Sequence, residues 1–526
     1  MKKITPKAFL IVTIISVTAF TYQDKSGKLQ IKTEMEKSAR KELLDVWYPK
    51  AIDTLYGGFL STFSYDFKPV NPQDKMIVTQ SRHIWSNAKA ALFYPNEPGF
   101  KNNAKHGYEF LRDKMWDKTH GGFYTLVAQN GTIKNGGFAP KEAYGNSFAI
   151  YGLAAYYQAS GDTSALNLAK KTFWWLENHS HDNKFKGYFQ HMKMDGTPIK
   201  RPENMPVSSE LGYKDQNSSI HLLESFTELY TVWPNATLRI RLQEMFFLVR
   251  DKITTPKGNL TLFFQPDWTP VSTRDLPDSV IEKNSSIDHV SFGHDVETAY
   301  LLLEAAHALG MNEALTLTKG KKMLDHALRN GWDNAVGGFY DEGYYFKNKS
   351  GISILKDSKN WWAQAEGMNT LLLMSNHFPN DKQQYYAKFT QLWKYINTYL
   401  IDHEHGDWYQ GGLDKQPQFQ KALKGQIWKG TYHNFRALMN CIQMLDPDTE
   451  APTPVKQLSR KQNTLSWQAA TDNRNLIGYN IYGNGRRIGF TPLLIYKLDM
   501  LKKEATRYSV KAVDLQGNVS LAISVQ

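Results

Sequence analysis

A short glycine-centred turn recurs along most of this 526-residue chain. Clear copies read DTLYGGF, DKTHGGF, DNKFKGYF, DNAVGGF and DHEHGDW, and a degenerate copy reads KGNLTLFF. Their leading glycines are Gly57, Gly121, Gly187, Gly258, Gly337 and Gly406. Each interval holds two helices and their loops, and the apolar spacing between copies is helical, as in FAIYGLAAYYQAS. Six helical hairpins predict an all-α (α/α)6 barrel, in which the inner helices bury both faces.

The pattern changes after Pro452. The strings TLSWQAA, GYNIYGNGRRIGF and RYSVKAVDLQGNVS alternate apolar and polar residues and contain Gly-Asn turns, which predicts a small all-β sandwich. These strings resemble a fibronectin type III module. The glycines of GNGRRIG have the wrong spacing for a dinucleotide site and no helix follows them, so we interpret them as a hairpin turn.

The N-terminus has the features of a secretory signal peptide. Lys2 and Lys3 precede the apolar stretch AFLIVTIISVTAF, which is short and contains several Thr and Ser residues. No cysteine directly follows this stretch, so a lipid anchor is not indicated. We therefore expect a signal peptide at residues 1–21, a barrel at 22–450 and a sandwich at 451–526, in a secreted or periplasmic protein without a membrane anchor after cleavage.

Composition excludes several other classes of protein. The net charge is +12, but the lysines are scattered and form no basic stripe, so nucleic-acid binding is not indicated. The single cysteine, Cys441, lies in an apolar helical pattern, which leaves no internal disulfide and no thiolate metal site. Aromatic residues make up 13% of the chain, and aromatic rings with a polar edge suit the stacking of sugars.

One polar or aromatic residue occupies a similar phase of each repeat. Because equivalent points on six hairpins lie at the same end of a ring, we expect these residues to converge on one pocket. They are Arg82, Tyr144, His221, His294, Trp362 and His433. A single histidine beside an apolar face is usually structural, but six such residues in phase favour an active site.

Several carboxylates and histidines lie near these positions in the sequence. Glu297 is three residues after His294, hence on one helix face, where it could orient the imidazole and favour its protonated form. Glu366, four residues after Trp362, could similarly reach the pocket rim. His403 and His405 suggest a metal pair, but they lie in a repeat loop without an obvious third ligand, so we expect no metal.

Together these strings resemble the N-acylglucosamine 2-epimerase superfamily, and within it the cellobiose and mannobiose 2-epimerases. The resemblance runs from about Leu43 to Leu445. Its motifs are Arg82-x-x-Trp85, the string from Asn217 to Glu224, GHDVE from Gly293, WWAQAE from Trp361, and Trp428 ahead of Tyr432-His433-Asn434. The chain departs from the cellobiose epimerases at Ser219, where a histidine is common, and at Tyr300, where a tryptophan is common.

The resemblance implies a role for each candidate residue. It implies that His294 and His433 are the acid/base pair and that Arg82 and His221 contact the oxygens at C1 and C2. It implies that four residues hold the sugar, namely Tyr144, Asn217, Trp362 and Trp428. Glu297 and Glu366 would orient the histidines. The expected substrate is a neutral disaccharide, and no cofactor is implied.

The chemistry suits these residue types independently. Epimerisation at C2 of an aldose requires ring opening, removal of a proton made acidic by the C1 aldehyde, and its return to the other face of a planar enediolate. Histidines can act as base in one direction and acid in the other near neutral pH. Arg82 can stabilise the enediolate oxygen.

Other functions remain open at this point. An (α/α)6 glycoside hydrolase needs two carboxylates, for which the candidates are Asp295, Glu297, Glu366 and Asp407. An N-acylglucosamine 2-epimerase or an aldose–ketose isomerase would share the enediolate chemistry. A secreted carbohydrate-binding protein would use the aromatic residues alone. The sequence does not indicate the oligomeric state.

Overall fold

The computed structural model describes residues 26–311, 313–498 and 507–526. The predicted signal peptide lies outside these described residues. Within them, the helices are all too short or too polar to cross a membrane.

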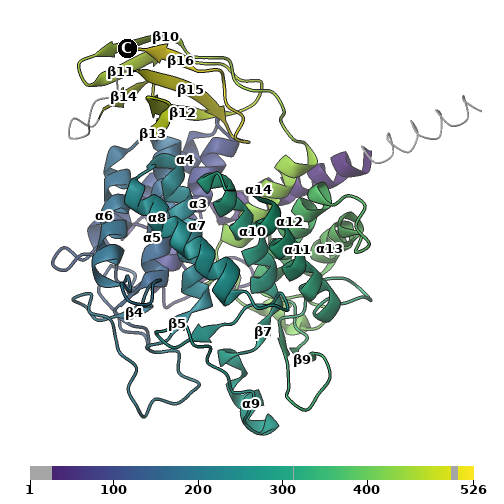
Figure 1. The fold of residues 1–526 in the computed structure, drawn as a ribbon. Coiled ribbons are helices and arrows are strands. Elements are labelled where there is room, and N and C mark those ends of the chain that lie inside the picture. Colours follow the sequence, from purple (N-terminus) through teal and green to yellow (C-terminus); the bar gives the residue numbers. More distant parts are fainter. Residues whose placement is uncertain (1–25, 312, 499–506) are drawn as a thin grey trace, which may run out of the picture.

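Six helices of the described chain form the inner ring of the predicted (α/α)6 barrel (Figure 1). They are α3 (Ile77–Phe93), α5 (Ala143–Ser160), α7 (Gln216–Val232), α10 (Phe292–Leu309), α12 (Trp361–His377) and α14 (Tyr432–Leu445). Each packs against the next, and α14 packs against α3, so the ring closes. Nearly every residue of α5 and α10 is buried, as expected for helices enclosed on all sides.

A second set of helices lies outside the ring and is amphipathic. These are α4 (Pro98–Phe110) with η2 (Leu111–Met115), α6 (Thr163–His179), α8 (Ala236–Phe247) with η3 (Leu248–Ile253), α11 (Glu313–Asn330) and α13 (Tyr385–Tyr399). Helical residues 26–37 continue into η1 (Ser38–Leu44) and α2 (Asp45–Trp47), and η1 packs against α14. The helix α6 shows local capping, because the Asp162 carboxylate accepts a hydrogen bond from the Ser164 amide.

The recurring turns connect outer helices to inner helices. Each closes with one backbone bridge, including the degenerate copy, where Thr254 pairs with Leu260. All six leading glycines have positive φ values, a conformation that L side chains disfavour. The glycine spacing therefore identified all six repeats correctly.

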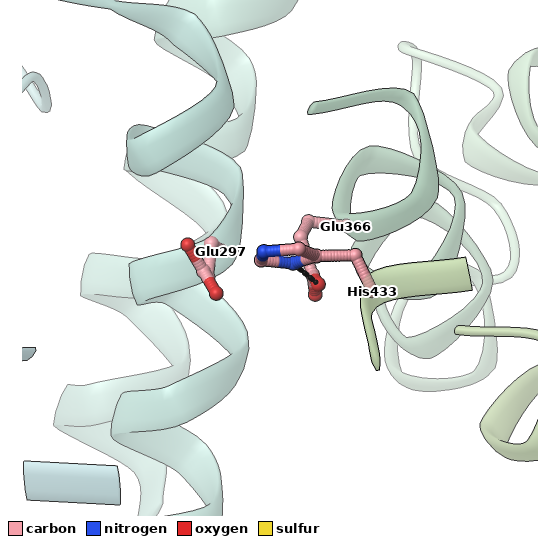
Figure 2. A group of neighbouring side chains, drawn as sticks. All are labelled: Glu297, Glu366 and His433. Atoms are coloured by element: carbon pink, nitrogen blue, oxygen red, sulfur yellow. Dashed lines mark hydrogen bonds and ion pairs between the residues drawn. The ribbon is translucent and has the colours of Figure 1, made fainter. Parts of the chain in front are cut away.

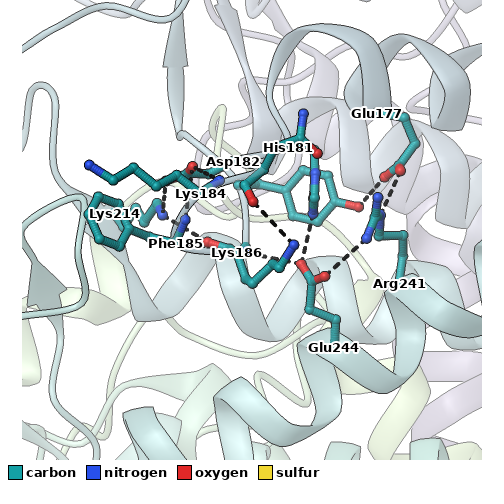
Figure 3. Close-up of polar contacts among 12 residues, drawn as sticks. Glu177, His181, Asp182, Lys184, Phe185, Lys186, Lys214, Arg241 and Glu244 are labelled. Atoms are coloured by element: carbon teal, nitrogen blue, oxygen red, sulfur yellow. Dashed lines mark hydrogen bonds and ion pairs between the residues drawn. The ribbon is translucent and has the colours of Figure 1, made fainter.

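In five of these turns, a buried lysine forms a salt bridge with the leading aspartate. The sequence analysis did not predict these salt bridges. In the third repeat, Nζ of Lys214 lies 2.7 Å from the Asp182 carboxylate and 2.8 Å from the Lys186 carbonyl (Figure 3). The same carboxylate accepts amide bonds within its own turn. The other lysines bound to the leading aspartate of a turn are Lys75, Lys141, Lys359 and Lys424.

Short strands and helices decorate the end of the barrel where the inner helices begin. The strands are β1 (Lys75–Met76), β2 (Leu126–Val127), β3 (Lys141–Glu142), β4 (His191–Met192), β5 (Lys214–Asp215), β6 (Phe263–Phe264), β7 (Val290–Ser291), β8 (Glu342–Tyr344) and β9 (Ser353–Lys356). The short helices are α9 (Asp278–Asn284), η4 (Ser285–Ile287) and η5 (Pro417–Lys421). The strands pair as β1-β2, β3-β4, β5-β6 and β7-β8-β9. These elements frame the entrance to the inner ring.

The C-terminal residues form the predicted β-sandwich. One sheet has the order β10-β11-β14 and the other β13-β12-β15-β16. The strands are β10 (Lys456–Lys461), β11 (Thr464–Gln468), β12 (Leu476–Gly483), β13 (Arg486–Thr491), β14 (Ile495–Lys497), β15 (Tyr508–Asp514) and β16 (Ile523–Val525). The string read as a turn is the β12-β13 hairpin, with positive φ at Asn484 and Gly485.

The sandwich docks on the barrel end opposite the short strands (Figure 1). The Tyr157 hydroxyl donates to the Phe490 carbonyl at 2.8 Å, and both residues are buried. Arg487 donates to the Tyr230 and Thr231 carbonyls at the C-terminal end of α7, where a cation complements the helix dipole. The packing therefore joins the two parts through both apolar and polar contacts.

Candidate active site

Most of the predicted site residues surround one cavity at the entrance to the inner ring. The cavity has a volume of about 200 Å³. Its lining residues are Arg82, Tyr144, Asn217, His221, His294, Glu297, Trp361, Trp362, Trp428 and His433. Nine of these ten were predicted from the sequence, and the tenth predicted residue, Glu366, lies fully buried behind His433.

The helical barrel explains this convergence. Each of the six in-phase residues lies within the first two turns of an inner helix, so the six helix starts surround the same space. Trp428 comes from the loop before α14 and is about one third exposed. It therefore forms the rim of the cavity, whereas the histidines lie at its floor.

Two of the three histidines are held by buried carboxylates. Nδ1 of His433 lies 2.7 Å from Glu366, and Nδ1 of His221 lies 2.8 Å from Glu224. A carboxylate can only accept a hydrogen bond, so each Nδ1 carries the proton. In the neutral imidazole this leaves the Nε2 lone pair available toward the cavity.

The third histidine has a different partner from the one we predicted. Nδ1 of His294 lies 2.8 Å from the Ser291 hydroxyl, whereas Glu297 binds Arg436. Burial, together with the nearby His221, lowers the pKa of His294 to about 3. The prediction that Glu297 orients His294 and favours its protonated form is therefore wrong, because Arg436 takes the carboxylate and burial outweighs it.

Arg436 organises the carboxylates beneath the histidines. Its guanidinium lies 2.6 Å from Glu297 and 2.6 Å from Glu366, and it also binds Glu224 and the Tyr432 hydroxyl. All three carboxylates and Arg436 are almost fully buried. One cation among three carboxylates leaves an excess of buried negative charge next to His221 and His433. This excess stabilises an imidazolium when one forms.

The pKa values of this cluster reflect two opposing effects, burial and the charges of neighbouring groups. Burial raises the pKa of Glu366, and Arg436 opposes the rise. Burial alone would also raise the pKa of Glu224, but Arg436 and His221 bring it down to about 2. The pKa of His433 is well below its usual value because of burial and the Arg82 charge. His294 and His433 are therefore neutral in the open cavity, with the Glu366 carboxylate behind His433.

The closest candidate metal ligands in this region are already satisfied by protein groups. Glu297, Glu366 and His433 have ligand atoms within 4.8 Å of one another (Figure 2). Arg436 supplies the cation between the two carboxylates. The histidine pair of the sixth repeat turn is also engaged, since His403 contacts Glu42 and the Asn397 carbonyl, and His405 contacts Asp402.

Aromatic rings position the cationic and sugar-facing groups. The Arg82 guanidinium lies 4.4 Å from the centroid of the Phe148 ring and donates to the Tyr144 hydroxyl at 3.3 Å. Trp362 contacts both proposed acid/base residues, with its ring centroid 4.7 Å from that of His294 and 5.9 Å from that of His433. This geometry places a planar ring and a cation beside the two imidazoles.

The sequence analysis missed the residues that support the histidines. Glu224 follows His221 by three positions, and Arg436 follows His433 by three, so the i, i+3 rule that we applied to His294 would have indicated both. Trp361 also lines the cavity. Its only sequence signal is its place beside Trp362.

A larger cavity of about 580 Å³ continues outward from the first. Both are lined by Tyr144, Asn217, His294 and Trp428. The outer cavity is bounded by the loops before α5, α7 and α10. The site therefore has a narrow inner chamber and a wider vestibule.

The carboxylates that a hydrolase would require are engaged elsewhere. Asp295 accepts from the Leu260 amide and lies 3.5 Å from His326. Asp407 binds Lys429 and Asn434. Glu297 and Glu366 are bound to Arg436, as described above. This arrangement does not present a pair of carboxylates across a glycosidic bond.

Ser219 and Tyr300, the two departures from the cellobiose epimerases, both lie away from the cavity lining. The Ser219 hydroxyl donates to the Asp215 carbonyl within the first turn of α7. The Tyr300 hydroxyl contacts Glu304 and Asn440 farther along the inner helices. In this chain, neither Ser219 nor Tyr300 lines the inner chamber.

Comparison with known proteins identifies the family of the chain. A model of the N-acylglucosamine 2-epimerase (GlcNAc 2-epimerase) family matches residues 57–437. The chain is 27% identical over 424 residues to a cellobiose 2-epimerase of Bacteroides fragilis, an alignment that covers 79% of this chain and 98% of that protein. It is 24% identical over 422 residues to a D-mannose isomerase of Marinomonas mediterranea, with 79% and 98% covered.

A solved structure leads to the same result. The cellobiose 2-epimerase from Spirochaeta thermophila DSM 6192 superposes with a TM-score of 0.67 at 27% identity, covering 80% of this chain and 98% of that one. The family match covers α3, α5, α7, α10 and α12 and the first six residues of α14, which include His433. The chain belongs to the N-acylglucosamine 2-epimerase family.

Proposed function

We propose that this protein is a 2-epimerase that interconverts glucose and mannose at the reducing end of a β-linked disaccharide, of the cellobiose or mannobiose type. The observation that carries the proposal is the pair His294 and His433, which line one small chamber and both contact Trp362. The relatives named cellobiose 2-epimerase support the same reaction.

The geometry accounts for each chemical step. After the sugar ring opens, a neutral imidazole removes the C2 proton, and the Arg82 guanidinium stabilises the enediolate oxygen. The second imidazole returns a proton to the opposite face of C2. The negative charge of the enediolate favours protonation of the second imidazole by solvent, which supplies the proton for that return. The first imidazolium then gives its proton to solvent, which restores the neutral pair.

The two histidines are not equivalent in this scheme. His433 has a carboxylate behind it, so its imidazolium is stabilised by Glu366. His294 has a hydroxyl behind it, from Ser291, and therefore favours the neutral form. His433 is thus the better acid and His294 the better resting base. Both exchange roles in the reverse reaction.

The vestibule supports a substrate of two sugar units. The inner chamber of about 200 Å³ suits the reducing sugar, and the adjoining cavity of about 580 Å³ leaves room for a second. Trp428 lies at the junction of the two cavities and offers an aromatic face for the second ring.

Product analysis tests the proposal. Cellobiose or mannobiose should give a product of unchanged mass with the opposite C2 configuration. Release of monosaccharides would indicate a hydrolase, and binding without conversion would indicate a carbohydrate-binding protein. A clear preference for N-acetylmannosamine over both disaccharides would refute the assigned substrate class.

Aldose–ketose isomerisation is the second candidate, supported by the D-mannose isomerase among the relatives. It shares the enediolate and differs in returning the proton to C1 instead of C2. A ketose as the main product, and mannose as a better substrate than cellobiose, would favour this function. The open vestibule favours the disaccharide epimerase.

Export remains part of the proposal, based on the N-terminal sequence. Fractionation of cells that produce the full chain should place the protein in the periplasm or the medium, with the mature N-terminus near residue 22. Retention of residues 1–21 on a cytoplasmic protein would refute export.

A further inference from the structure

A second cavity lies at the opposite end of the barrel, between the inner helices and the β-sandwich. Its volume is about 550 Å³, within the range of about 300–1,000 Å³ typical of small-molecule sites. The ends of α10, α12 and α14 form one wall. The opposite wall includes Pro447 of the linker, just after the end of α14 at Leu445, and the turn at Leu515 and Gln516 of the sandwich.

The helix wall carries amide and hydroxyl groups in place of the apolar residues usual at a helix interface. Asn369 and Asn376 lie on one face of α12, seven residues apart, and Asn440 lies on the facing side of α14. The Asn440 amide donates to the Tyr300 hydroxyl at 3.0 Å, and Tyr300 in turn donates to Glu304. The cavity thus presents donors and acceptors close together.

Asn369 provides the main argument for a ligand. Its side chain is fully buried and lines this cavity. Among the described residues, neither its amide nitrogen nor its amide oxygen has a hydrogen-bond partner. Burial of an unpaired amide is costly, so a group that enters the cavity and both donates and accepts would relieve this cost.

The chemistry of the wall selects the class of ligand. Lys28 and Glu304 give the lining one basic and one acidic residue, so the wall does not select a charged ligand of either sign. The amides of Asn369, Asn376 and Asn440 pair equally well with hydroxyl donors and acceptors. Leucine side chains, Leu372 and Leu373 among them, complete the lining and can contact the C–H face of a ring. These features fit a neutral polyhydroxylated molecule.

We propose that this rear cavity is a second saccharide-binding site, formed jointly by the barrel and the β-sandwich. It is separate from the chamber of His294 and His433, and it does not depend on the proposed epimerase activity. The family match ends at residue 437, before the linker and the sandwich. The proposal therefore gives the C-terminal module a function, because the module supplies one wall of the site.

The site also has a structural connection to the active site. The Arg436 guanidinium lies 5.9 Å from the centroid of the Tyr300 ring, and Arg436 holds the carboxylates beneath the histidines. A saccharide that contacts Tyr300 would therefore lie one residue away from the Arg436 cluster.

Equilibrium dialysis of the full chain with labelled cellobiose tests the proposal by stoichiometry. The variant Asn369→Leu removes the unpaired amide and keeps a side chain of similar size. The matched control is Thr298→Val, because the Thr298 hydroxyl is also buried without a partner but lies outside the two cavities. Both variants should fold with at least the wild-type melting temperature.

The expected result is that Asn369→Leu binds one cellobiose fewer per chain than the wild type, while Thr298→Val binds the same number as the wild type. A crystal structure with cellobiose should show a sugar beside Asn369. Equal stoichiometry in wild type and Asn369→Leu, or only an ordered water beside Asn369, would overturn the proposal. If the epimerase proposal is wrong and the active site does not bind cellobiose, the wild type, Asn369→Leu and Thr298→Val should all bind fewer molecules by the same number. Asn369→Leu should then still bind one cellobiose fewer than the other two.

Discussion

The buried Arg436 cluster leads to a prediction about both stability and turnover. In the variant Arg436→Met, the carboxylates of Glu224, Glu297 and Glu366 lose the buried cation that all three of them bind. Each charge pair contributes about 4 kcal/mol of Coulomb energy at an effective dielectric constant of 20. Desolvation offsets much of this, and breaking a buried pair typically costs about 3–5 kcal/mol.

Chemical denaturation should therefore show Arg436→Met to be destabilised by about 3–5 kcal/mol. Loss of Arg436 also raises the pKa of Glu366, because its charge opposes the effect of burial. A protonated Glu366 no longer stabilises an imidazolium at His433, so turnover of the folded variant should fall by about 10² or more. Steady-state kinetics on cellobiose, with folding checked by circular dichroism, measures this.

Two further variants separate charge from packing. Arg436→Lys keeps the charge but loses the two-pronged geometry and should lie between wild type and Arg436→Met. The double variant Arg436→Met/Glu297→Gln removes one uncompensated carboxylate and should recover part of the lost stability. If Arg436→Met lies within 1 kcal/mol and threefold of the wild type, the cluster does not support the histidines as described.

Three more perturbations follow from the structure. Because the pKa of His294 is about 3 in the folded protein and about 6.5 in an unfolded chain, the unfolded state binds more protons between these values and stability falls as the pH drops below 6.5. His294→Gln removes this loss. Denaturation should therefore show that, relative to the wild type, the variant is about 2 kcal/mol more stable at pH 5 than it is at pH 7. The same stability difference between variant and wild type at both pH values would mean that His294 does not titrate in this way. Lys214→Met leaves Asp182 buried without its cation and should lower the free energy of unfolding by about 3 kcal/mol. The exposed control Lys184→Met should change it by no more than about 0.5 kcal/mol. Equal effects of the two variants would mean that the Lys214–Asp182 pair does not stabilise the turn. A chain ending at Pro452 keeps every active-site residue and should retain most of its turnover when folded, although the loss of the docked sandwich should lower its melting temperature; loss of nearly all turnover in a folded truncation would show that the sandwich contributes to the chamber.

Much of the architecture could be predicted from the sequence because its signals are local. A glycine at positive φ marks each outer-to-inner turn, and those glycines are separated by whole hairpins. The strands of the sandwich also follow a local alternation. The position of the sandwich on the barrel could not be predicted, since contacts such as that of Tyr157 with Phe490 join residues far apart in the chain.

The candidate site was predictable to a similar extent. Residues in phase on six repeats, such as Arg82 and His433, lie on one cavity because the ring has approximate sixfold repetition. Pairing between helices was not predictable. Glu297 could reach His294 along its own helix, but it binds Arg436 from α14 instead, and the sequence does not indicate which neighbouring helix supplies the stronger partner.

The five buried lysines show the same limit. Each lies shortly before an inner helix, for example Lys214 two residues before α7, in a segment that reads as an ordinary polar loop. Their burial depends on the leading aspartate of the preceding turn, which becomes a neighbour only when the outer and inner helices pack. A repeat-by-repeat comparison of lysines would have shown the pattern.

Deuterium incorporation from heavy water tests the central claim most directly. If His294 and His433 carry the C2 proton, the wild type should place solvent deuterium at C2 of the reducing sugar as the epimer of cellobiose forms. His433→Asn and His294→Gln should remain folded and slow both exchange and epimerisation together by about 10²–10⁴, and the double variant should lose little more than the slower single one. Epimerisation without deuterium at C2, or His433→Asn within about tenfold of wild-type activity at a lowered melting temperature, would contradict the account and leave His433 with a structural role.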